Sequence, residues 1–233
     1  MRKRFDRYKK FAEVTFEETF TQAELGGSFV TTSECFESSY LENMGNGEFK
    51  RKPLPLRCQF SPLFGMLTGD YNSDGHLDIL ITGNSYTTEV STGNYDAMTG
   101  LILFGDGKGN FQPLISSSTG FWADGDSKGI AQIHLADNSL ATLVANNNDK
   151  LQAYRFLKRK STPISVNTDD VYALVHKKDG SSFKHEFYFG NAYLSSSSRA
   201  LYYSDPVVSI TIYNNNGVKR EIRILPSAIK SKL

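Results

Sequence analysis

The residues best suited to chemistry are concentrated in one short loop, Asp70 to Asp78, with the sequence Asp-Tyr-Asn-Ser-Asp-Gly-His-Leu-Asp. Oxygen-bearing side chains stand at nearly every second position, and Gly75 stands where such a loop must turn sharply. Ca²⁺ is a hard cation that takes about 6–8 oxygen ligands at about 2.3–2.6 Å. The spacing therefore predicts a Ca²⁺ site. Its expected ligands are the side chains of Asp70, Asn72, Asp74 and Asp78 and the backbone carbonyl of His76.

The residues after the loop indicate which kind of calcium loop this is. An EF-hand needs a Glu at loop position twelve and a helix on each side, but position twelve counted from Asp70 is Ile81. Residues 77–82 are mostly aliphatic and β-branched, so they predict a buried strand. The alternative is an Asx-rich turn that caps a hairpin, because Asp, Asn and Gly are also ordinary turn residues. Three carboxylates in so short a loop favour the metal, since they would repel one another without a cation.

The predicted cation is structural rather than catalytic. Its ligands would use most of the coordination shell, which leaves little room for a substrate. Other catalytic arrangements are weak, because the histidines lie far apart without the spacing of zinc ligands. The serine run 195–198 also lacks the flanking glycines of a G-x-S-x-G motif. The histidines are His76, His134, His176 and His185. We therefore expect a protein that is not an enzyme.

Trp122 is the candidate for ligand contact outside the loop. It lies beside Phe121 between predicted strands, and an exposed tryptophan there would be able to stack on a sugar ring. The alternative is packing in the hydrophobic core, which is the more common environment of such a residue. The nearby Asp124 and Asp126 lack the spacing of a second calcium loop, so we interpret them as turn residues.

The composition excludes several classes of protein. The chain has 233 residues, a net charge of +1 and 39% hydrophobic residues, so no global field attracts it to nucleic acid. No apolar run approaches the roughly 20 residues that span a bilayer, and no secretory signal follows the basic start. Cys35 and Cys58 match no metal or redox motif. We expect two buried thiols, with a disulfide as the alternative.

Internal similarity recurs along the middle of the chain. The turns Gly45-Asn-Gly-Glu-Phe49 and Gly107-Lys-Gly-Asn-Phe111 are alike, and 107 − 45 is 62. Asn84 and Asn146 follow similar strands, and 146 − 84 is again 62. Each unit predicts a small antiparallel sheet. The next copy of the loop has lost its ligands, so we expect one metal. The residues at the four side-chain positions are Gln132, His134, Ala136 and Leu140.

The two ends of the chain differ from the middle. Apolar residues at three- and four-residue steps predict an amphipathic helix over residues 1–27. Residues 161–233 return to a β pattern, with hairpin turns at Asp179-Gly180 and Asn216-Gly217. The run Ser195 to Ser198 is either a flexible loop or a fixed turn. The predicted segments are a helical segment 1–27, a repeat region 28–160 and a β segment 161–233.

The loop and its flanking turns carry a family likeness. The Asp70 to Asp78 loop followed by a hydrophobic strand, with Gly-x-Gly-x-Phe turns on either side, resembles the FG-GAP (VCBS-type) repeat of integrin α-subunit propellers and many bacterial surface proteins. Residues 39–49 resemble the repeat ending common in Bacteroidetes. Residues 187–199 and 212–221 resemble the ASPIC/UnbV segment that follows such repeats. Together these stretches span most of the chain.

The resemblance implies a mainly β protein with two to three blades of a β-propeller and Ca²⁺ in the loop. Family propellers close a ring of about 4–8 blades, so we expect the C-terminal part of a longer protein, with further blades and the signal upstream. It also implies non-catalytic recognition or adhesion, with an unidentified protein or glycan partner, at a bacterial cell surface, outside the cell or in the periplasm. The alternatives are an enzyme or accessory subunit acting on polysaccharide, and a purely structural repeat.

Overall fold

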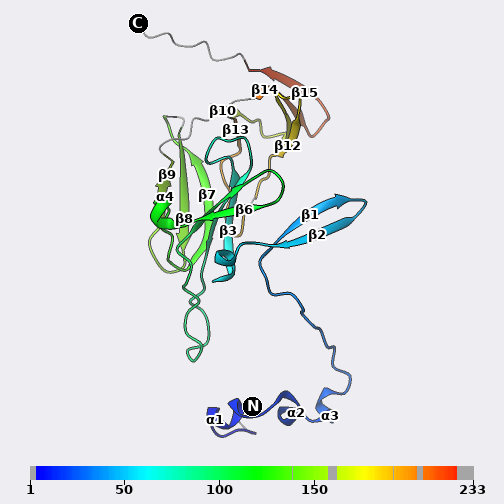
Figure 1. The fold of residues 1–233 in the computed structure, drawn as a ribbon, viewed down its shortest axis with the longest axis vertical. Helices are drawn as coiled ribbons and strands as arrows, with labels where there is room; N and C mark the ends of the chain where they lie inside the picture. Colours follow the sequence, from blue (N-terminus) through cyan, green and yellow to red (C-terminus); the bar gives the residue numbers. More distant parts are fainter. Residues whose placement is uncertain (1–3, 138, 157–161, 191, 204–206, 225–233) are drawn as a thin grey trace. The chain divides into compact units, whose positions relative to one another are not determined.

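The computed structural model describes residues 4–137, 139–156, 162–190, 192–203 and 207–224. The protein is mainly β, with several small antiparallel sheets and a few short helices (Figure 1). This confirms the prediction of a mainly β protein, while the propeller blades stay a prediction. The chain divides into two units, residues 1–36 and residues 37–233.

The first unit is helical, but it holds three short helices instead of the one helix that the sequence predicts. They are α1 (Tyr8–Ala12), α2 (Phe16–Thr19) and α3 (Gln22–Leu25). Thr15 and Thr21 have extended backbones and form capping boxes with Glu18 and Glu24. Each capping box starts a new helix and so interrupts the axis of the one before it. Residues 1–3 of the predicted helix lie outside the described residues.

The second unit begins with a hairpin, which is followed by a four-stranded sheet. The hairpin joins β1 (Ser39–Gly45) to β2 (Glu48–Pro53), and the 3-10 helix η1 (Leu56–Gln59) leads to the sheet. The sheet has the order β3 (Leu63–Gly69), β4 (Asp78–Gly83), β5 (Leu101–Gly105) and β6 (Phe111–Leu114). The Gly-x-Gly-x-Phe turns join β1 to β2 and β5 to β6. Their glycines have positive φ angles, which glycine adopts at little cost.

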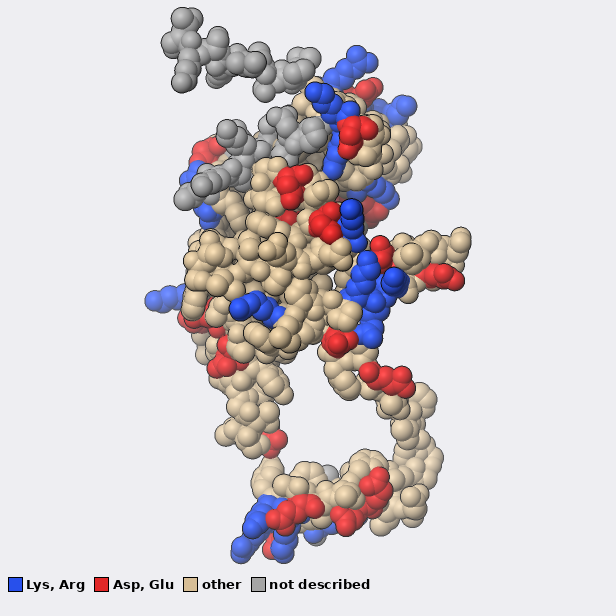
Figure 2. All heavy atoms as spheres, in the orientation of Figure 1, with Lys and Arg blue, Asp and Glu red and all other residues tan. Residues whose placement is uncertain are grey.

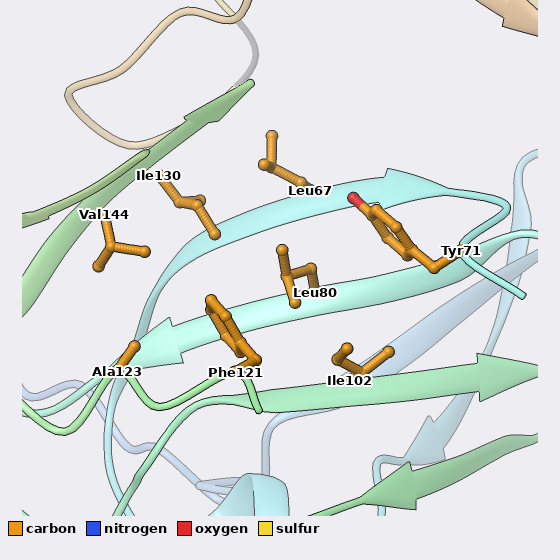
Figure 3. Close-up of a cluster of buried hydrophobic side chains, with 8 residues drawn as sticks. All are labelled: Leu67, Tyr71, Leu80, Ile102, Phe121, Ala123, Ile130 and Val144. Carbon is orange, nitrogen blue, oxygen red and sulfur yellow. The ribbon is translucent and has the colours of Figure 1, made fainter. Parts of the chain in front are cut away.

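A three-stranded sheet shares a hydrophobic core with the first sheet. After α4 (Ser116–Thr119), the strands run in the order β7 (Ser127–His134), β8 (Leu140–Asn146) and β9 (Gln152–Arg155). Side chains of the two sheets point toward one another in Figure 3, with Leu80 from β4 and Ile130 from β7 among them. Full burial of such a side chain contributes about 1.5–3 kcal/mol. The shared cluster therefore holds the sheets together.

The second sheet has no counterpart of the Asp70 to Asp78 loop. β8 begins at Leu140 and β4 at Asp78, and 140 − 78 is again 62. However, Gln132 and His134 lie inside β7, which pairs with β8 as far as the His134–Leu140 pair. The short connection between these strands leaves no loop of nine residues to surround a cation. The internal repeat itself stays a prediction.

The remaining strands form two further sheets. β10 (Thr162–Ser165) pairs with β13 (Ala200–Tyr203). The other sheet has the order β12 (Ser182–Glu186), β11 (Asp170–Lys177), β14 (Val207–Asn214) and β15 (Lys219–Arg223). The predicted hairpin turns at Asp179-Gly180 and Asn216-Gly217 are confirmed, because they join β11 to β12 and β14 to β15. Ala173 and Val175 of β11 alternate into a core of their own.

The serine run is part of an ordered segment, residues 193–198, that we call the serine strap. Ser195 Oγ accepts a hydrogen bond from the N–H of Ile130 at 3.3 Å and donates to the carbonyl of Ile130 at 2.9 Å. Ser197 Oγ accepts from the N–H of Gln132 at 2.9 Å, and the N–H of Ser198 donates to the carbonyl of Gln132 at 2.8 Å. The serine strap thus covers an edge of β7. Of the two alternatives for Ser195 to Ser198, a flexible loop or a fixed turn, the structure shows the fixed conformation.

The two cysteines have different environments. Cys58 is fully buried, and burial raises the pKa of its thiol to about 11. Cys35 is exposed. The expectation of buried thiols is therefore right for Cys58 and wrong for Cys35, and neither described cysteine is part of a disulfide.

Candidate functional site

The Asp70 to Asp78 loop connects β3 to β4 and is anchored by Tyr71. The Tyr71 side chain is only 8% exposed and packs into the core shared by the two sheets. Its ring stacks on Phe156 with the centroids 4.8 Å apart, and its hydroxyl accepts a hydrogen bond from the side chain of Gln132. The loop is therefore attached to both sheets, with its polar residues carried outside the core.

Three of the predicted ligands shape the loop by accepting backbone N–H groups. The two carboxylate oxygens of Asp70 accept from the N–H of Asp74 and of Gly75, each at 3.1 Å. Asn72 Oδ1 also accepts from the N–H of Asp74, at 3.0 Å, and Asp74 Oδ1 accepts from the N–H of His76 at 2.8 Å. These bonds are those of consecutive Asx turns. They turn the chain at Ser73, which has a φ of 64°.

Asp78 is the buried member of the predicted ligand set. Its side chain is completely buried, and its two oxygens accept from the N–H of Tyr71 at 2.7 Å and of Gly105 at 3.0 Å. Burial raises the pKa of this carboxyl, and the charge of Asp74 adds to the rise, while the two backbone donors oppose it. Asp78 therefore joins the start of the loop to β5, in surroundings that disfavour its charged form relative to water.

A second turn, residues 105–110, lies against the loop. The ring of His76 lies over Gly107, where an added Cβ would come 2.5 Å from Nδ1. Asp106 in this turn accepts from the N–H groups of Lys108 and Asn110. The side-chain amide of Asn110 also donates to Asp106, and these bonds lower the pKa of the Asp106 carboxyl to about 2. The predicted His76 ligand is its carbonyl, and the ring serves to pack the two turns together.

A lysine from the C-terminal sheet also reaches the loop. Lys177, the last residue of β11, donates from Nζ to the carbonyl of Gly75 at 2.7 Å. The ammonium group therefore sits on the same nine-residue segment that carries the three carboxylates.

The donor set of the loop fits a hard cation in its chemistry. Every predicted ligand is an oxygen, as Ca²⁺ requires, and the carboxylate and amide oxygens come from alternate residues of one loop. The carboxylates nevertheless turn toward backbone N–H groups, and Asn72 Nδ2 donates to Asp74 Oδ2 at 2.8 Å. Within the described ranges, no group of three or more His, Cys, Asp and Glu side chains is gathered as a metal site. The Ca²⁺ site stays a prediction.

Trp122 lies away from the core, in contrast to the packing that the sequence favours. Its side chain is 51% exposed, whereas Phe121 and Ala123 on either side are buried. The carbonyl of Trp122 accepts hydrogen bonds from the side chains of Gln152 and Tyr154. The backbone at Trp122 is thus held by two side chains of β9, while about half of the Trp122 side chain is exposed to solvent.

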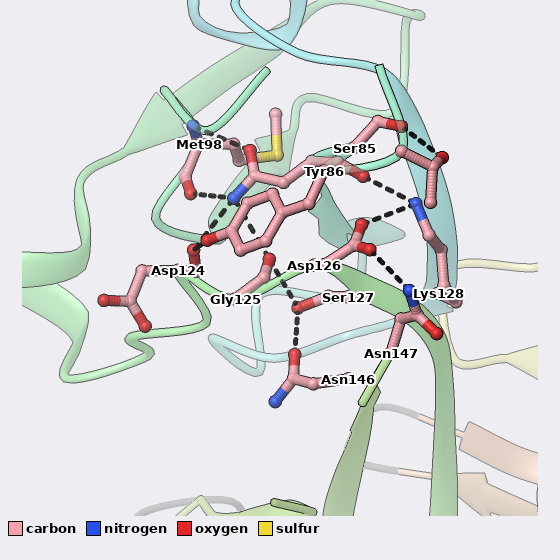
Figure 4. Close-up of polar contacts among 12 residues, drawn as sticks. Ser85, Tyr86, Met98, Asp124, Gly125, Asp126, Ser127, Lys128, Asn146 and Asn147 are labelled. Atoms are coloured by element: carbon pink, nitrogen blue, oxygen red, sulfur yellow. Dashed lines mark hydrogen bonds and ion pairs between the residues drawn. The ribbon is translucent and has the colours of Figure 1, made fainter. Parts of the chain in front are cut away.

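Asp126 forms a buried polar cluster that the sequence does not reveal (Figure 4). It is 2% exposed and forms an ion pair with Lys128 at 2.6 Å. Asn147 Nδ2 donates to its other oxygen at 3.0 Å, and Lys128 Nζ donates to the carbonyl of Asn84 at 2.9 Å. Burial favours a higher pKa for Asp126, but these hydrogen bonds and the charge of Lys128 outweigh it and lower the pKa. The interpretation as a simple turn residue is therefore incomplete.

Charged side chains of both signs lie on the surface, and the helices of the described residues are short. Basic and acidic side chains are interspersed on the face shown in Figure 2, which agrees with the net charge of +1. None of the helices in the described part of the chain has the length and apolar character that crossing a membrane requires.

No protein-family model matches the chain, and no curated protein matches its sequence. The likeness to FG-GAP repeats and to the ASPIC/UnbV segment therefore rests on the motifs alone.

Proposed function

We propose that the protein is a calcium-stabilised, non-catalytic binding module built from propeller-type blades. The observation that carries this proposal is the loop of residues 70–78, in which alternate oxygen donors surround a turn, and the pKa of a buried carboxylate, Asp78, is raised by burial and further by the charge of Asp74. Like charges held close together favour the binding of a cation. When bound, Ca²⁺ would supply positive charge to the loop and no chemistry beyond it.

The sheets support the propeller part of the proposal. β3 to β6 form an antiparallel meander of four strands, which is the size and order of one propeller blade. The hairpin β1–β2 has the same turn motif as β5–β6, which form the last two strands of that meander. A hairpin alone is marginally stable in water. Blades outside this chain, or in another chain, would complete such a half-blade.

In this proposal, each predicted ligand contributes to the binding of the cation in a different way. Asp70, Asn72 and Asp74 contribute side-chain oxygens from the exposed part of the loop, and His76 contributes its carbonyl. Asp78 contributes charge from the buried end. The bond from the Tyr71 N–H to Asp78 and the packing of its ring hold the loop at the entry to β4. The cation would therefore stabilise the junction of loop and sheet.

Calcium-dependent thermal unfolding tests this proposal. A ligand at about 10–100 times its Kd stabilises a protein by about 1.4–2.7 kcal/mol, which corresponds to a rise of roughly 3–11 °C in the melting temperature. We expect such a rise between EDTA and about 10 mM Ca²⁺ for the unmodified chain, because extracellular calcium modules typically bind with a Kd of about 10⁻⁴–10⁻³ M. Asp70→Asn should lose it.

Asp106→Asn is the matched control. Asp106 also accepts two backbone N–H groups in an exposed turn, but it is outside the predicted ligand set. This variant should keep the full calcium response. Identical melting curves of the unmodified chain with and without Ca²⁺ would refute the proposed site.

The proposed recognition surface contains Trp122. The exposed indole on a held backbone is suited to stack on a sugar ring or on an apolar side chain of a protein. Trp122→Ala should abolish binding to any glycan or protein ligand found in a screen, and Tyr188→Ala, which removes another exposed aromatic ring, should not. Turnover of a glycan that depends on a carboxylate outside residues 70–78 would favour the enzymatic alternative.

The proposed location is the bacterial cell surface, the periplasm or the extracellular space. Extracellular calcium modules typically bind with a Kd of about 10⁻⁴–10⁻³ M. A measured Kd in that range would support this location. A nanomolar Kd would be that of a cytosolic calcium buffer and would contradict it.

A further inference from the structure

The contact between Lys177 and the loop links two distant parts of the sequence. Lys177 Nζ lies 2.7 Å from the carbonyl oxygen of Gly75, although the two residues are 102 positions apart. An added Cβ at Gly75 would lie 3.7 Å from the same nitrogen. The ammonium therefore lies directly on the turn of the predicted calcium loop.

Hydrogen bonds of the β11–β12 turn fix the backbone at Lys177. The pairing of β11 with β14 shifts its register between His176 and Lys177. The N–H of Lys177 donates to Ser181 at 2.9 Å, and its carbonyl accepts from Gly180 at 3.1 Å, which closes the β11–β12 turn. Nζ also lies 5.6 Å from the centroid of the Phe183 ring. Lys177 therefore lies at the end of β11, where these hydrogen bonds close the turn of the β11–β12 hairpin.

The charges of the loop favour a cationic side chain close to it. Asp70, Asp74 and Asp78 give the segment three carboxylates, and these attract an ammonium group bound to the Gly75 carbonyl, as does Asp179 in the β11–β12 turn. A divalent cation bound by the same carboxylates would remove that attraction and repel the ammonium. Binding of Ca²⁺ and contact of the Lys177 ammonium with the same loop therefore disfavour each other.

We propose that Lys177 competes with Ca²⁺ for the loop of residues 70–78. Binding of Ca²⁺ weakens the attachment of the β11–β12 hairpin to this loop, and the attachment in turn weakens the binding of Ca²⁺. The inference rests on the calcium site proposed above. Coupling between two binding events is reciprocal, so one factor describes both effects. For charges held on one short loop, that factor should be about tenfold.

Calcium titration of two lysine variants tests the coupling. Lys177→Met removes the charge and keeps an unbranched side chain, whereas Lys178→Met removes the neighbouring charge from an exposed turn residue. We expect Lys177→Met to bind Ca²⁺ about tenfold more tightly than the unmodified chain, and Lys178→Met to bind as the unmodified chain does. At about 1 M salt, where the Debye length is about 3 Å, the gain in Ca²⁺ affinity of Lys177→Met over the unmodified chain should become smaller.

The outcomes separate this inference from the proposed function. Equal or weaker binding by Lys177→Met, with normal binding by the unmodified chain, overturns the competition and leaves the calcium site intact. Absence of binding in all three proteins refutes the calcium site and the competition with it.

A measurement on the unmodified chain keeps the test independent of variant folding. Saturating Ca²⁺ should raise the rate at which an amine-reactive label modifies Lys177, relative to Lys178, by a factor of up to about ten. Unchanged relative labelling, while Ca²⁺ binding is measured in the same sample, would overturn the inference.

Discussion

Asp78 has a role in the fold that does not depend on a metal ion. Asp78→Asn replaces one of its two acceptor oxygens with an amide that faces a backbone N–H, either of Tyr71 or of Gly105. A buried donor without an acceptor costs about 1–3 kcal/mol. We expect a loss of that size in the free energy of unfolding, measured by urea denaturation in EDTA. Asp74→Asn in the exposed part of the loop should cost less, and equal losses would contradict this role.

The Asp126 ion pair should make stability depend on acidic pH. Because the folded-state pKa of Asp126 is lowered, its contribution is fully present above the unfolded-state pKa, about 3.9, and is lost as the pH falls through the folded-state value. Asp126→Asn should therefore be less stable than the unmodified chain at about pH 7, by at most roughly 3–5 kcal/mol, because Lys128 loses its ionic partner but keeps its hydrogen bond to the Asn84 carbonyl. The difference should narrow toward about pH 3.

Denaturant unfolding at several pH values measures this difference. A gap between the two proteins that stays constant over the acidic range would show that Asp126 contributes through packing alone and not through its charge.

Gly107 and His76 are expected to interact as a pair. Gly107→Ala places a methyl group against the His76 ring, and it also puts a non-glycine residue at a φ of 70°. Adding His76→Ala relieves the contact but not the backbone strain, which costs roughly 1 kcal/mol. The double variant should therefore be more stable than the sum of the two single effects, as measured in a double-mutant cycle. Simple additivity would contradict the contact.

The serine strap makes a prediction about the edge of β7. Replacement of Ser195 and Ser197 by alanine leaves the N–H groups of Ile130 and Gln132 without those side-chain acceptors. We expect a loss of about 1–3 kcal/mol in the free energy of unfolding and faster hydrogen exchange at these two amides. Ser196→Ala is the control, because Ser196 Oγ donates to Phe189 and not to β7.

If exchange at Ile130 and Gln132 is unchanged in the double alanine variant, the strap does not protect the strand. The hydroxyls of Ser195 and Ser197, which take the place of a further strand at this edge of β7, would then contribute nothing to its protection. Exposed sheet edges are prone to pair with other chains, so the same variant should also be checked for aggregation by light scattering.

The division at residue 36 predicts how the chain responds to protease. Phe29, Val30 and Phe36 are among the most exposed apolar residues, and the chain around them forms no helix or strand. Chymotrypsin should therefore cleave there first. The fragment that starts near residue 37 should keep the circular dichroism and the melting temperature of the second unit, because its own contacts define it. A fragment that unfolds on cleavage would contradict the division.

Several features could be predicted from the sequence because they depend on neighbouring residues. The glycines of the turns at 45–49 and 107–111 allow positive φ angles, so the hairpins form where the sequence places them. The hairpins at Asp179-Gly180 and Asn216-Gly217 follow the same rule. The loop of residues 70–78 also takes its shape from Asx turns between its own residues.

The sequence misjudged features that depend on distant residues. The sequence favours core packing for Trp122, but its side chain is exposed, and its carbonyl is bound by Gln152 and Tyr154, which lie about thirty residues further along the chain. The burial of Asp126 depends on Lys128 and Asn147, and no spacing marks that cluster in advance. The helix predicted over 1–27 is divided because local capping by Thr15 and Thr21 outweighs a continuous apolar stripe.

The amino-acid sequence by itself determined the turns, the β class and the grouping of oxygen donors in one loop, because these follow from backbone conformations available to each residue and its nearest neighbours. Only the tertiary structure decided which side of the loop is buried, that Ser195 and Ser197 cover β7, and that Lys177 lies against Gly75. Contacts of this kind depend on how separate sheets pack, and the free energy of packing is shared among many residues far apart in the chain.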